Sequence, residues 1–398
     1  MGWKGVMLPM TRLRSQRASA TPALTTRTRL AYLDNLKVLL IAGIIAAHAV
    51  NSYTEFGSWA YQGVREVSIS PAAESVFVSV VSLTVLFMMG LFFLISGLLT
   101  PPALERKGVK RFVHDRLLRL GVPFVAFTLL LWPLTIFALQ EPILHRGSYW
   151  YWFTHVDPFL DNGPMWFIGV LLVYSLGYAA WCARYRPSPP TGSGEQLRAR
   201  VLVGFGAAIA VTSFVVRLAF PVNSGQVGNL HLWEWPQCLG MFVLGTLSAR
   251  RGWLTPVSDR MRRSCGAVAL VAGASVPVMV LSADALGLDE NDYFGGFGWP
   301  SLATCAAEGA LAVAACVWIL GFAQRHMNRL GPMRRALARS SYAAFLLQGP
   351  VLIGFALALR PFDLAGGMKA LILAAAGVAG SFALAWPVVT RTGLRRIV

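Results

Sequence analysis

The chain alternates between long apolar stretches and short polar connections along nearly its whole length. Each apolar stretch is close to the roughly 20 residues that an α-helix needs to cross a bilayer. Ten such stretches occur, at residues 36–52, 76–99, 117–138, 165–183, 201–220, 232–249, 266–284, 301–323, 342–359 and 368–390. The pattern therefore predicts an all-α polytopic membrane bundle of about ten transmembrane helices.

Charged residues are confined mostly to the connections, and their sign alternates from one connection to the next. Hydrophobic residues occupy 56% of the 398 positions and charged residues only 13%, about half the share in soluble domains. With the N-terminus inside, all but five of the 35 Lys and Arg residues fall on the inner side, and 13 of the 18 acids on the outer side. This positive-inside pattern predicts cytoplasmic termini and a cell-membrane location. The net charge of +17 then requires no nucleic-acid partner.

The two ends of the chain lie outside the apolar stretches. Residues 1–29 are rich in arginine but lack the apolar core of a signal peptide, so they predict a flexible basic cytoplasmic tail. The transmembrane domain is expected over residues 30–390, with a short basic cytoplasmic tail at 391–398. A Pro-, Gly- and Ser-rich run at 187–194 indicates a linker between two groups of helices.

The five cysteines lie in or beside predicted spans and form no CxxC pair. This placement is typical of small apolar residues in a core. We therefore predict neither a metal site nor a permanently bound cofactor.

The first predicted span, within LDNLKVLLIAGIIAAHAVNSY at 33–53, carries polar side chains on one helical face. Lys37 and His48 are 11 residues apart, which is about three turns with roughly 20° left over and about 16 Å along the axis. Asp34 lies on the same stripe. Because ionisable groups within a span are expensive, the stripe indicates a path from a charged inner mouth to an imidazole near the outer surface. A histidine that only fills space would fit the same pattern.

Three further charges are expected near the outer ends of later spans. Arg217 ends the fifth span, Glu234 begins the sixth, and Glu308 lies in the outer half of the eighth. Because buried charges must pair or face water, Arg217 is expected to form an ion pair with Glu234 or Glu308. Such a pair would either hold helices together or contact a substrate.

The DNGPMWFIG segment leads into the fourth span from the same outer side and contributes Asp161, Asn162 and Trp166. Aromatic faces stack on sugar rings, and carboxylates accept hydrogen bonds from hydroxyl groups. The outer loops are therefore compatible with a sugar ligand, although loops of this composition are common.

The inner ends of the second and third spans combine small and basic residues. Ser96 and Gly97 in FFLISG lack bulk, which permits close approach of a ligand or of a neighbouring helix. In RFVHDRLLRLGVPF, Arg116 and Arg119 are three residues apart, so their guanidinium groups can point to one side and bind phosphates. The positive-inside rule alone also predicts arginines at such helix ends.

Taken in order, these segments resemble the acyltransferase 3 family of integral membrane acyltransferases, which modify hydroxyl groups of sugars, envelope glycans and some secondary metabolites. The resemblance extends from about Leu33 to Leu352. Its matching blocks are LDNLKVLLIAGIIAAH, FFLISGLL, RFVHDRLLRLGVPF, MWFIGVLLVYSL, WPQCLGMFVLGTLSARRGWL and SYAAFLLQGPVL.

The resemblance implies particular site residues. His48 stands at the position of the family's catalytic histidine, Lys37 at that of a basic partner 11 residues earlier, and Arg116 with Arg119 at those of an RxxR pair. The family usually has Arg in place of Lys37 and commonly has His in place of Gln348. Lysine keeps the charge but loses the planar two-pronged donor, and glutamine cannot transfer a proton.

The implied cosubstrate is an acyl-coenzyme A, by family habit acetyl-coenzyme A, which would arrive from the cytoplasm. Its pantetheine arm extends on the order of 15–20 Å, comparable with the rise from Lys37 to His48. The residues expected to meet the charged end of this donor are Lys37, Ser96, Arg111, Arg116 and Arg119.

His48 is expected to act as general base on a hydroxyl of the acceptor. Asp34 is about 21 Å below it by helical rise, so Glu308 or Glu234 is the expected carboxylate that orients the imidazole. The acceptor, a molecule that carries sugar or other hydroxyl groups, is expected to enter from outside. Its predicted contacts are Asp161, Asn162, Trp166 and Arg217. The bilayer is the other expected partner, and the sequence sets no oligomeric state.

Two other functions fit part of the pattern. A transporter or exporter would share the ten spans and the intramembrane charges, but it would leave the FFLISG and RxxR segments without a shared purpose. A catalytically inactive membrane protein of the same fold is favoured by Lys37 and Gln348. Formation of a covalent product from a coenzyme A donor distinguishes the enzyme from both.

Overall fold

The computed structural model describes residues 1–2, 31–55, 59–144, 147–155, 160–186, 197–222, 224, 226–329 and 331–393. Residues Met1–Leu30 form one unit and residues Ala31–Val398 another, and the fold below is that of the second unit. The predicted linker at 187–194 lies outside the described residues, as do most of the predicted tails at 1–29 and 391–398.

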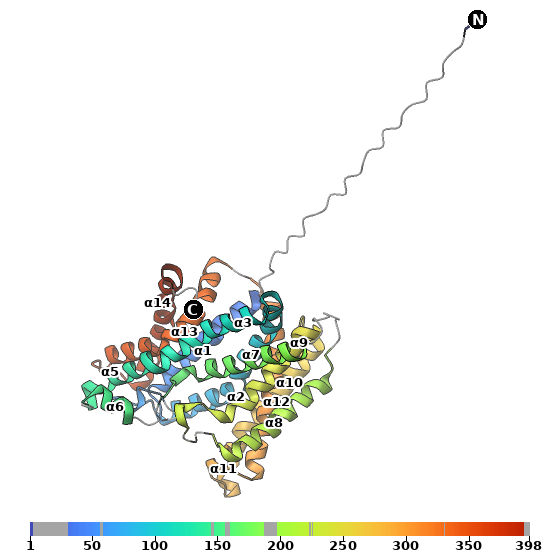
Figure 1. The fold of residues 1–398 in the computed structure, drawn as a ribbon. Coiled ribbons are helices and arrows are strands. Elements are labelled where there is room, and N and C mark those ends of the chain that lie inside the picture. Colours follow the sequence, from blue (N-terminus) through green and yellow to red (C-terminus); the bar gives the residue numbers. More distant parts are fainter. Residues whose placement is uncertain are drawn as a thin grey trace. The chain divides into compact units, whose positions relative to one another are not determined.

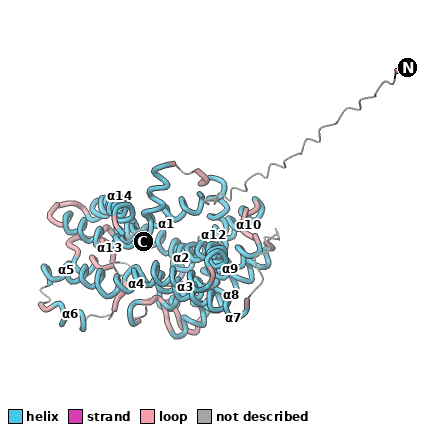
Figure 2. The backbone as a smooth tube through the Cα atoms, turned by 45° about the horizontal axis from the view of Figure 1, so that its top comes forward, coloured by secondary structure: helices cyan, strands magenta, loops and turns pink. Residues whose placement is uncertain are grey.

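Every regular element in the described ranges is helical, which confirms the prediction of an all-α polytopic membrane bundle (Figures 1 and 2). Eight helical segments are long and apolar enough to cross a bilayer. They are α1 (Ala31–Asn51), α2 (Pro71–Lys107), the segment Val109–Glu141, the segment Gly163–Tyr185 with α7 (Trp166–Tyr185), α8 (Ala199–Ala219), α12 (Trp299–His326), α13 (Pro332–Leu359) and α14 (Gly366–Arg391). The other two predicted spans, at 232–249 and 266–284, are also helical. They correspond to α9 (Trp235–Arg251) and α10 (Asp259–Ser282).

The connections that we expect on the outer side contain further short helices. They are η1 (Gln62–Val64), α6 (Tyr149–His155), η4 (Gly163–Met165), η5 (Val227–Asn229), η6 (Leu232–Glu234), η7 (Asp284–Leu286) and α11 (Glu290–Phe294). These turns give the outer connections a defined backbone, which positions the side chains discussed below.

The third span is not a uniform α-helix. It consists of α3 (Val109–Arg116), the π-helical η2 (Leu117–Gly121), α4 (Val122–Ala126), the π-helical η3 (Phe127–Leu131) and α5 (Trp132–Leu144). Pro123 and Pro133 each stand two positions after the last residue of a π-helical segment. A proline clashes with the carbonyl four residues earlier in an α-helix, so a wider preceding turn accommodates it.

Helix α12 is the most buried of the spanning helices and packs against α2, α8 and α10. Helix α1 packs against α13 and α14, which also pack against each other. Helices α2 and α9 approach most closely where Gly97 faces Gly245, because a Cβ atom on either glycine would overlap backbone atoms of the other helix. The small residues of FFLISG therefore serve helix packing at Gly97.

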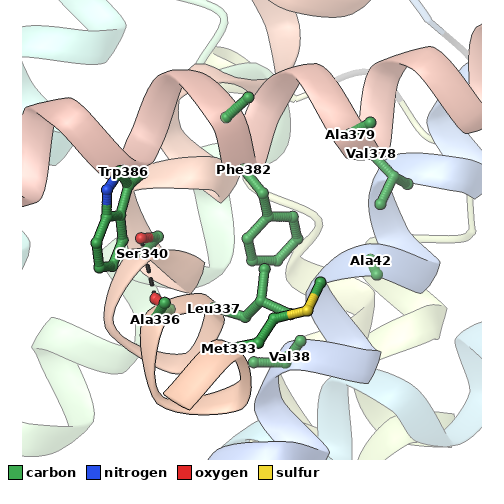
Figure 3. A pocket seen from close by; sticks show the side chains of 11 residues that line it. Val38, Ala42, Met333, Ala336, Leu337, Ser340, Val378, Ala379, Phe382 and Trp386 are labelled. Atoms are coloured by element: carbon green, nitrogen blue, oxygen red, sulfur yellow. Dashed lines mark hydrogen bonds between the residues drawn. The ribbon is translucent and has the colours of Figure 1, made fainter.

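An apolar groove of about 420 Å³ lies between α1, α13 and α14 (Figure 3). The Ser340 hydroxyl donates to the Ala336 carbonyl oxygen at 3.1 Å, so it presents no free donor to the groove. The lining residues are Val38, Ala42, Met333, Ala336, Leu337, Ser340, Val378, Ala379, Phe382, Ala383 and Trp386. The groove therefore offers room for apolar groups along one flank of α1.

Candidate active site

His48 lies in the last turn of α1 and is half-buried between two other parts of the chain. The indole of Trp59 stacks on its imidazole, with 4.3 Å between ring centroids and 12° between ring planes. On α13, the Gln348 side chain lies 3.1 Å from the imidazole, measured from Oε1 to Nδ1. One face and one edge of the ring are therefore fixed by neighbours.

The contact with Gln348 defines which nitrogen of His48 can act as a base. An amide oxygen only accepts hydrogen bonds, so the contact between Oε1 and Nδ1 requires the proton on Nδ1. In a neutral imidazole the other nitrogen, Nε2, then carries the free lone pair. Gln348 is completely buried, which excludes water as a competing partner for this contact.

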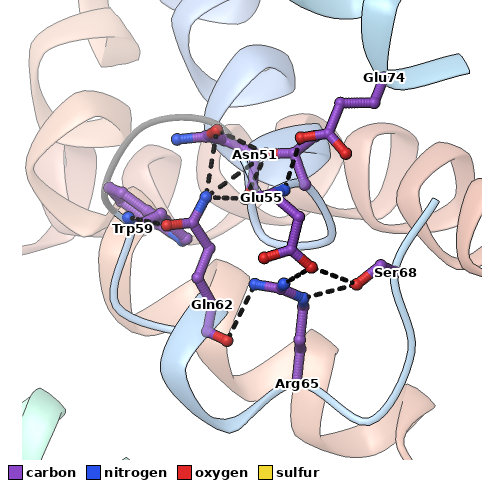
Figure 4. A network of polar contacts seen from close by, with 8 residues as sticks. Asn51, Glu55, Trp59, Gln62, Arg65, Ser68 and Glu74 are labelled. Carbon is purple, nitrogen blue, oxygen red and sulfur yellow. Dashed lines mark hydrogen bonds and ion pairs between the residues drawn. The ribbon is translucent and has the colours of Figure 1, made fainter. Parts of the chain in front are cut away.

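Trp59 belongs to the connection between α1 and α2, and a polar network fixes that connection (Figure 4). The Trp59 backbone N–H donates to Gln62 Oε1 at 2.9 Å, and Gln62 Nε2 donates to the Asn51 carbonyl oxygen at 2.9 Å. Gln62 thus joins Trp59 to the last residue of α1. Arg65 adds an ion pair with Glu55 and donates from Nη1 to the Gln62 carbonyl oxygen at 3.1 Å.

A second set of contacts ties the same connection to α14. Lys369 lies 2.6 Å from Glu66, measured from Nζ to Oε1, and is buried. Tyr61 donates to Glu66 Oε2 at 2.7 Å. Partial burial raises the pKa of Glu66, but the hydrogen bonds from Lys369 and Tyr61 outweigh it and hold the pKa below its usual value. Glu66 is therefore ionised at neutral pH and anchors the connection.

Trp132 extends the aromatic group around His48. Its ring lies 5.6 Å from that of Trp59, and its Nε1 donates to Asp161 Oδ2 at 2.9 Å. Two glycines leave room for this ring, because a Cβ atom on Gly163 or Gly349 would meet Trp132 atoms at 2.5 or 2.7 Å. Gly349 directly follows Gln348, so the same short segment of α13 holds both the imidazole and the Trp132 indole in place.

Arg217, Glu308 and Glu234 form a second buried cluster. The Arg217 guanidinium lies 2.5 Å from Glu308, measured from Nη2 to Oε2, which confirms the expected ion pair between α8 and α12. Glu234 interacts electrostatically with both of these residues. All three side chains are buried. The place beside His48 that we expected a carboxylate to occupy is held instead by Gln348, because Glu308 is engaged by Arg217.

The other predicted acceptor contacts join the two clusters. Asn162 is buried and donates to the Gly228 carbonyl oxygen. The Trp166 ring lies 5.1 Å from that of His231, which lies 6.0 Å from Trp233. Burial lowers the pKa of His231 to about 4, so the ring is neutral at pH 7.

Trp233 in turn contacts the Arg217 cluster, since the Arg217 guanidinium lies 5.5 Å from the Trp233 ring centroid. Asp161 and Trp166 are only five positions apart in the chain. The segment from Asp161 to Trp166 therefore contacts Trp132 of the His48 group directly and reaches the Arg217 cluster by way of His231 and Trp233.

The predicted donor residues lie at the other ends of α1, α2 and α3. Arg116 is half-buried, and its Nη2 lies 3.4 Å from Thr100 Oγ1, which in turn donates to the Ser96 carbonyl oxygen at 2.8 Å. Arg119 and Arg111 are exposed. The π-helical turn that begins at Leu117 widens the spacing between Arg116 and Arg119 relative to an α-helix, so Arg116 faces α2 while Arg119 is exposed.

Lys37 is half-buried on α1, as is Asp34. Their neighbour Asn35 is buried, and its Nδ2 donates to the carbonyl oxygens of Met327 and Arg329 at 2.6 and 3.0 Å. The inner end of α1 is thereby tied to the segment between α12 and α13, which fixes the height of Lys37 in the bundle.

Sequence reasoning missed Trp59 and Trp132 as site residues. Trp59 lies in a connection whose path follows no helical periodicity, and Trp132 follows a π-helical segment that shifts the expected register. The abundance of Trp in the outer connections was the available signal. Within the described residues, no group of three His, Cys, Asp or Glu side chains could hold a metal ion.

Comparison with known proteins identifies the family. No curated protein and no solved structure matches the chain. A family model described as an acyltransferase domain matches residues 30–390, a range that contains α1 with His48, α13 with Gln348, and all the clusters described above. The chain therefore belongs to the acyltransferase 3 family and is a multi-pass membrane acyltransferase.

Proposed function

We propose that this protein moves an acyl group, by default acetyl, from cytoplasmic acyl-coenzyme A to a hydroxyl group of an extracytoplasmic glycan, glycoside or small molecule. The observation that carries the proposal is the setting of His48, whose Nδ1 contacts Gln348 and whose Nε2 is left as the base. Family membership supports acyl transfer as the reaction class. The cell membrane is the proposed location, with both termini in the cytoplasm.

The proposed donor site lies at the inner ends of α1, α2 and α3. Arg116, Arg119, Arg111 and Lys37 supply positive charge for the phosphates of coenzyme A, and the Ser96 turn of α2 lies beside Arg116 through Thr100. Two basic groups in reach of one phosphate form short charge-assisted hydrogen bonds. From this end, the thioester reaches His48 about 16 Å further along α1.

The proposed acceptor site lies among the outer connections. Asp161 and Trp166 flank the start of α7, and the Asn162 Oδ1 atom is buried without a hydrogen-bond partner. Such an acceptor atom suits a ligand hydroxyl, because an unsatisfied buried oxygen is otherwise unfavourable. Arg217, Glu308 and Glu234 supply the charged border of this region in the proposal, with the two carboxylates acting on the acceptor side rather than on Nδ1 of His48.

The proposed chemistry is a direct transfer. His48 Nε2 takes the proton of the acceptor hydroxyl as its oxygen attacks the thioester carbonyl carbon. The tetrahedral intermediate then expels the thiolate of coenzyme A, and the imidazolium returns the proton to that sulfur. Imidazole suits both steps because its ordinary pKa of about 6.5 lies near physiological pH.

The direct test is acyl transfer by the purified protein from acetyl-coenzyme A to a panel of glycan and glycoside acceptors. We expect His48→Ala to lower kcat by about 10²–10⁴-fold, the usual contribution of a general base. His155→Ala is the matched control, because His155 is exposed on α6. Equal transfer by wild type and His48→Ala would remove the general-base role. Flux of an unmodified solute, with no acylated product from any donor, would favour a transporter instead.

Lys37 provides a second test, on the donor side. The Lys37→Arg variant keeps the charge, so its affinity for acetyl-coenzyme A should stay near that of wild type, whereas Lys37→Ala should bind more weakly. If Lys37→Arg and Lys37→Ala bind acetyl-coenzyme A equally well in a direct binding measurement, Lys37 lies outside the donor site.

A further inference from the structure

Two N–H groups beside His48 are buried and have no hydrogen-bond partner among the described residues. They are Nε1 of Trp59 and Nε2 of Gln348. An indole N–H and an amide NH₂ can only donate hydrogen bonds, so each requires an acceptor. A buried donor without one is unfavourable by about 1–3 kcal/mol. Two of them around one imidazole indicate a site for an acceptor atom.

Trp132, in the same aromatic group, has an indole N–H with a hydrogen-bond partner. Its Nε1 donates to Asp161 at 2.9 Å, and its ring lies 5.6 Å from that of Trp59. The chain therefore supplies a carboxylate to one of the two neighbouring indoles and none to the other. The unsatisfied donor is the one on the indole that stacks on His48.

Both free donors lie close to the imidazole. The amide nitrogen of Gln348 is about 2.2 Å from its own oxygen by covalent geometry, and that oxygen is 3.1 Å from His48 Nδ1. The Trp59 indole, whose ring contains Nε1, lies 4.3 Å from the imidazole between centroids. Both donors therefore belong to the immediate surroundings of the imidazole.

Contacts within the chain hold both donors in place before any ligand arrives. Trp59 is fixed by the hydrogen bond from its backbone N–H to Gln62, and only 8% of its surface is exposed. Gln348 is fixed by its contact with His48 and by burial on α13. Donors that are fixed in advance in a site shielded from water stabilise a developing negative charge most strongly.

We propose that Trp59 Nε1 and Gln348 Nε2 form an oxyanion site that receives the thioester carbonyl oxygen of the acyl donor. This inference rests on the proposed acyl transfer. It assigns to Gln348 a second task, since its oxygen holds Nδ1 of the base while its nitrogen serves the substrate. It also gives a reason for an amide at this position, because one amide group carries both an acceptor and a donor.

Such a site fits the electron flow of the proposed transfer. When the acceptor oxygen bonds to the carbonyl carbon, the C=O π pair moves to the carbonyl oxygen, while the hydroxyl proton passes to His48 Nε2. The oxyanion accepts from Trp59 and Gln348 at this stage. The pair then returns to re-form the C=O bond, the C–S bond breaks with its electrons on sulfur, and the imidazolium proton neutralises the thiolate.

The Trp59→Phe variant removes one donor and keeps an aromatic ring over His48. We expect kcat to fall by about 10²–10³-fold, the usual effect of losing one oxyanion donor, with KM for both substrates changed less than about threefold. The melting temperature should fall only by what the smaller buried ring costs, because the deleted N–H has no partner among the described residues. Trp150→Phe, on the exposed surface of α6, is the matched control and should match wild type.

A spectroscopic measurement tests the two donors without turnover. Isotope-edited infrared spectra of bound carbonyl-¹³C acetyl-coenzyme A should show the carbonyl stretch shifted to lower wavenumber in wild type and in the His155→Ala control. The shift should shrink in Trp59→Phe and in Gln348→Met.

The outcomes distinguish the two proposals. If wild type transfers the acyl group while Trp59→Phe keeps its kcat within about threefold, the oxyanion site is wrong and the proposed function stands. An unshifted carbonyl stretch in wild type would also overturn the oxyanion site. If wild type transfers nothing from any acyl-coenzyme A, the proposed function itself fails.

Discussion

The two buried polar clusters of this protein differ in the interaction that holds them together. In the Arg217 cluster, the guanidinium is paired with Glu308 and lies against Trp233, so the central contact is between opposite charges. The His48 cluster contains no ion pair among its described contacts and is held by ring stacking and by the contact with Gln348. Both clusters leave buried polar atoms without a partner among the described residues, but only beside His48 do all of these atoms belong to neutral N–H donors, which suits an oxygen acceptor.

The same comparison explains why charge alone is a poor guide to the reactive position. Arg217 and Glu308 are the most conspicuous intramembrane charges in the sequence, yet they are engaged with each other. The groups around His48 are neutral at their contacts and come from the outer connection and from α5 and α13. Their chemistry becomes visible only when the hydrogen-bond partners are accounted for atom by atom.

The largest effect is expected from breaking the ion pair of the Arg217 cluster. Arg217→Met leaves Glu308 and Glu234 buried without a compensating cation, and should lower stability by about 3–5 kcal/mol. Thermal unfolding in detergent measures this loss. The double variant Arg217→Met, Glu308→Met should recover much of it, because it removes a charge as well. By contrast, His48→Ala should change the melting temperature little. If Arg217→Met unfolds at the same temperature as wild type, the ion pair does not stabilise the Arg217 cluster, and the comparison between the two clusters fails.

A smaller effect is expected from the glycine that makes room for Trp132. Gly163 has φ +48° and a Cβ atom there would meet Trp132, so Gly163→Ala should destabilise by about 1–3 kcal/mol and slow acyl transfer by displacing the rings next to His48. Gly147→Ala is the matched control. Gly147 also has positive φ, at +78°, but its added Cβ would meet no atom within 4 Å. Similar transfer rates for both variants would mean that the position of Trp132 does not affect the His48 cluster.

The smallest of these effects concerns the anchor of the connection that carries Trp59. The pKa of Glu66 is lowered in the folded protein, so its stabilising contribution is complete above the ordinary carboxyl pKa and is lost as pH falls through the folded value. We expect a loss of about 1–2 kcal/mol below roughly pH 4 in wild type. Glu66→Gln should lack this component when melting temperatures are compared from pH 3 to 7. A common pH dependence would show that Glu66 does not anchor the connection.

Much of the bundle was predictable from sequence because hydrophobic length and charge sign are local properties. The ten predicted stretches all coincide with helices, and the Arg217 to Glu308 pair followed from the rule that buried charges must be matched. The ends of the helices were less well predicted. Helix α2 runs from Pro71 to Lys107, well beyond the apolar stretch at 76–99, because amphipathic turns continue a helix into water.

The composition of the candidate site was only partly predictable. Position on α1 singles out His48, but Gln348 lies 300 residues away and its contact depends on the packing of α1 against α13. Trp59 is held near the end of α1 by the hydrogen bond that its backbone N–H donates to Gln62, which in turn donates to Asn51, and no periodic pattern encodes these contacts. Tertiary contacts of this kind depend on several segments at once, so they are not determined by any one of them.

The glycine contact between α2 and α9 also constrains how this bundle can move. Where Gly97 meets Gly245, the two backbones touch with no side chain between them, so neither helix can slide or rotate past the other without a steric clash. The seam between α1, α13 and α14 has the opposite character, because the groove of about 420 Å³ leaves its side chains room to rearrange. The flank of the helix that carries Lys37 and His48 therefore has room for side-chain rearrangement, whereas α2 and α9 are held in register by contact between their backbones.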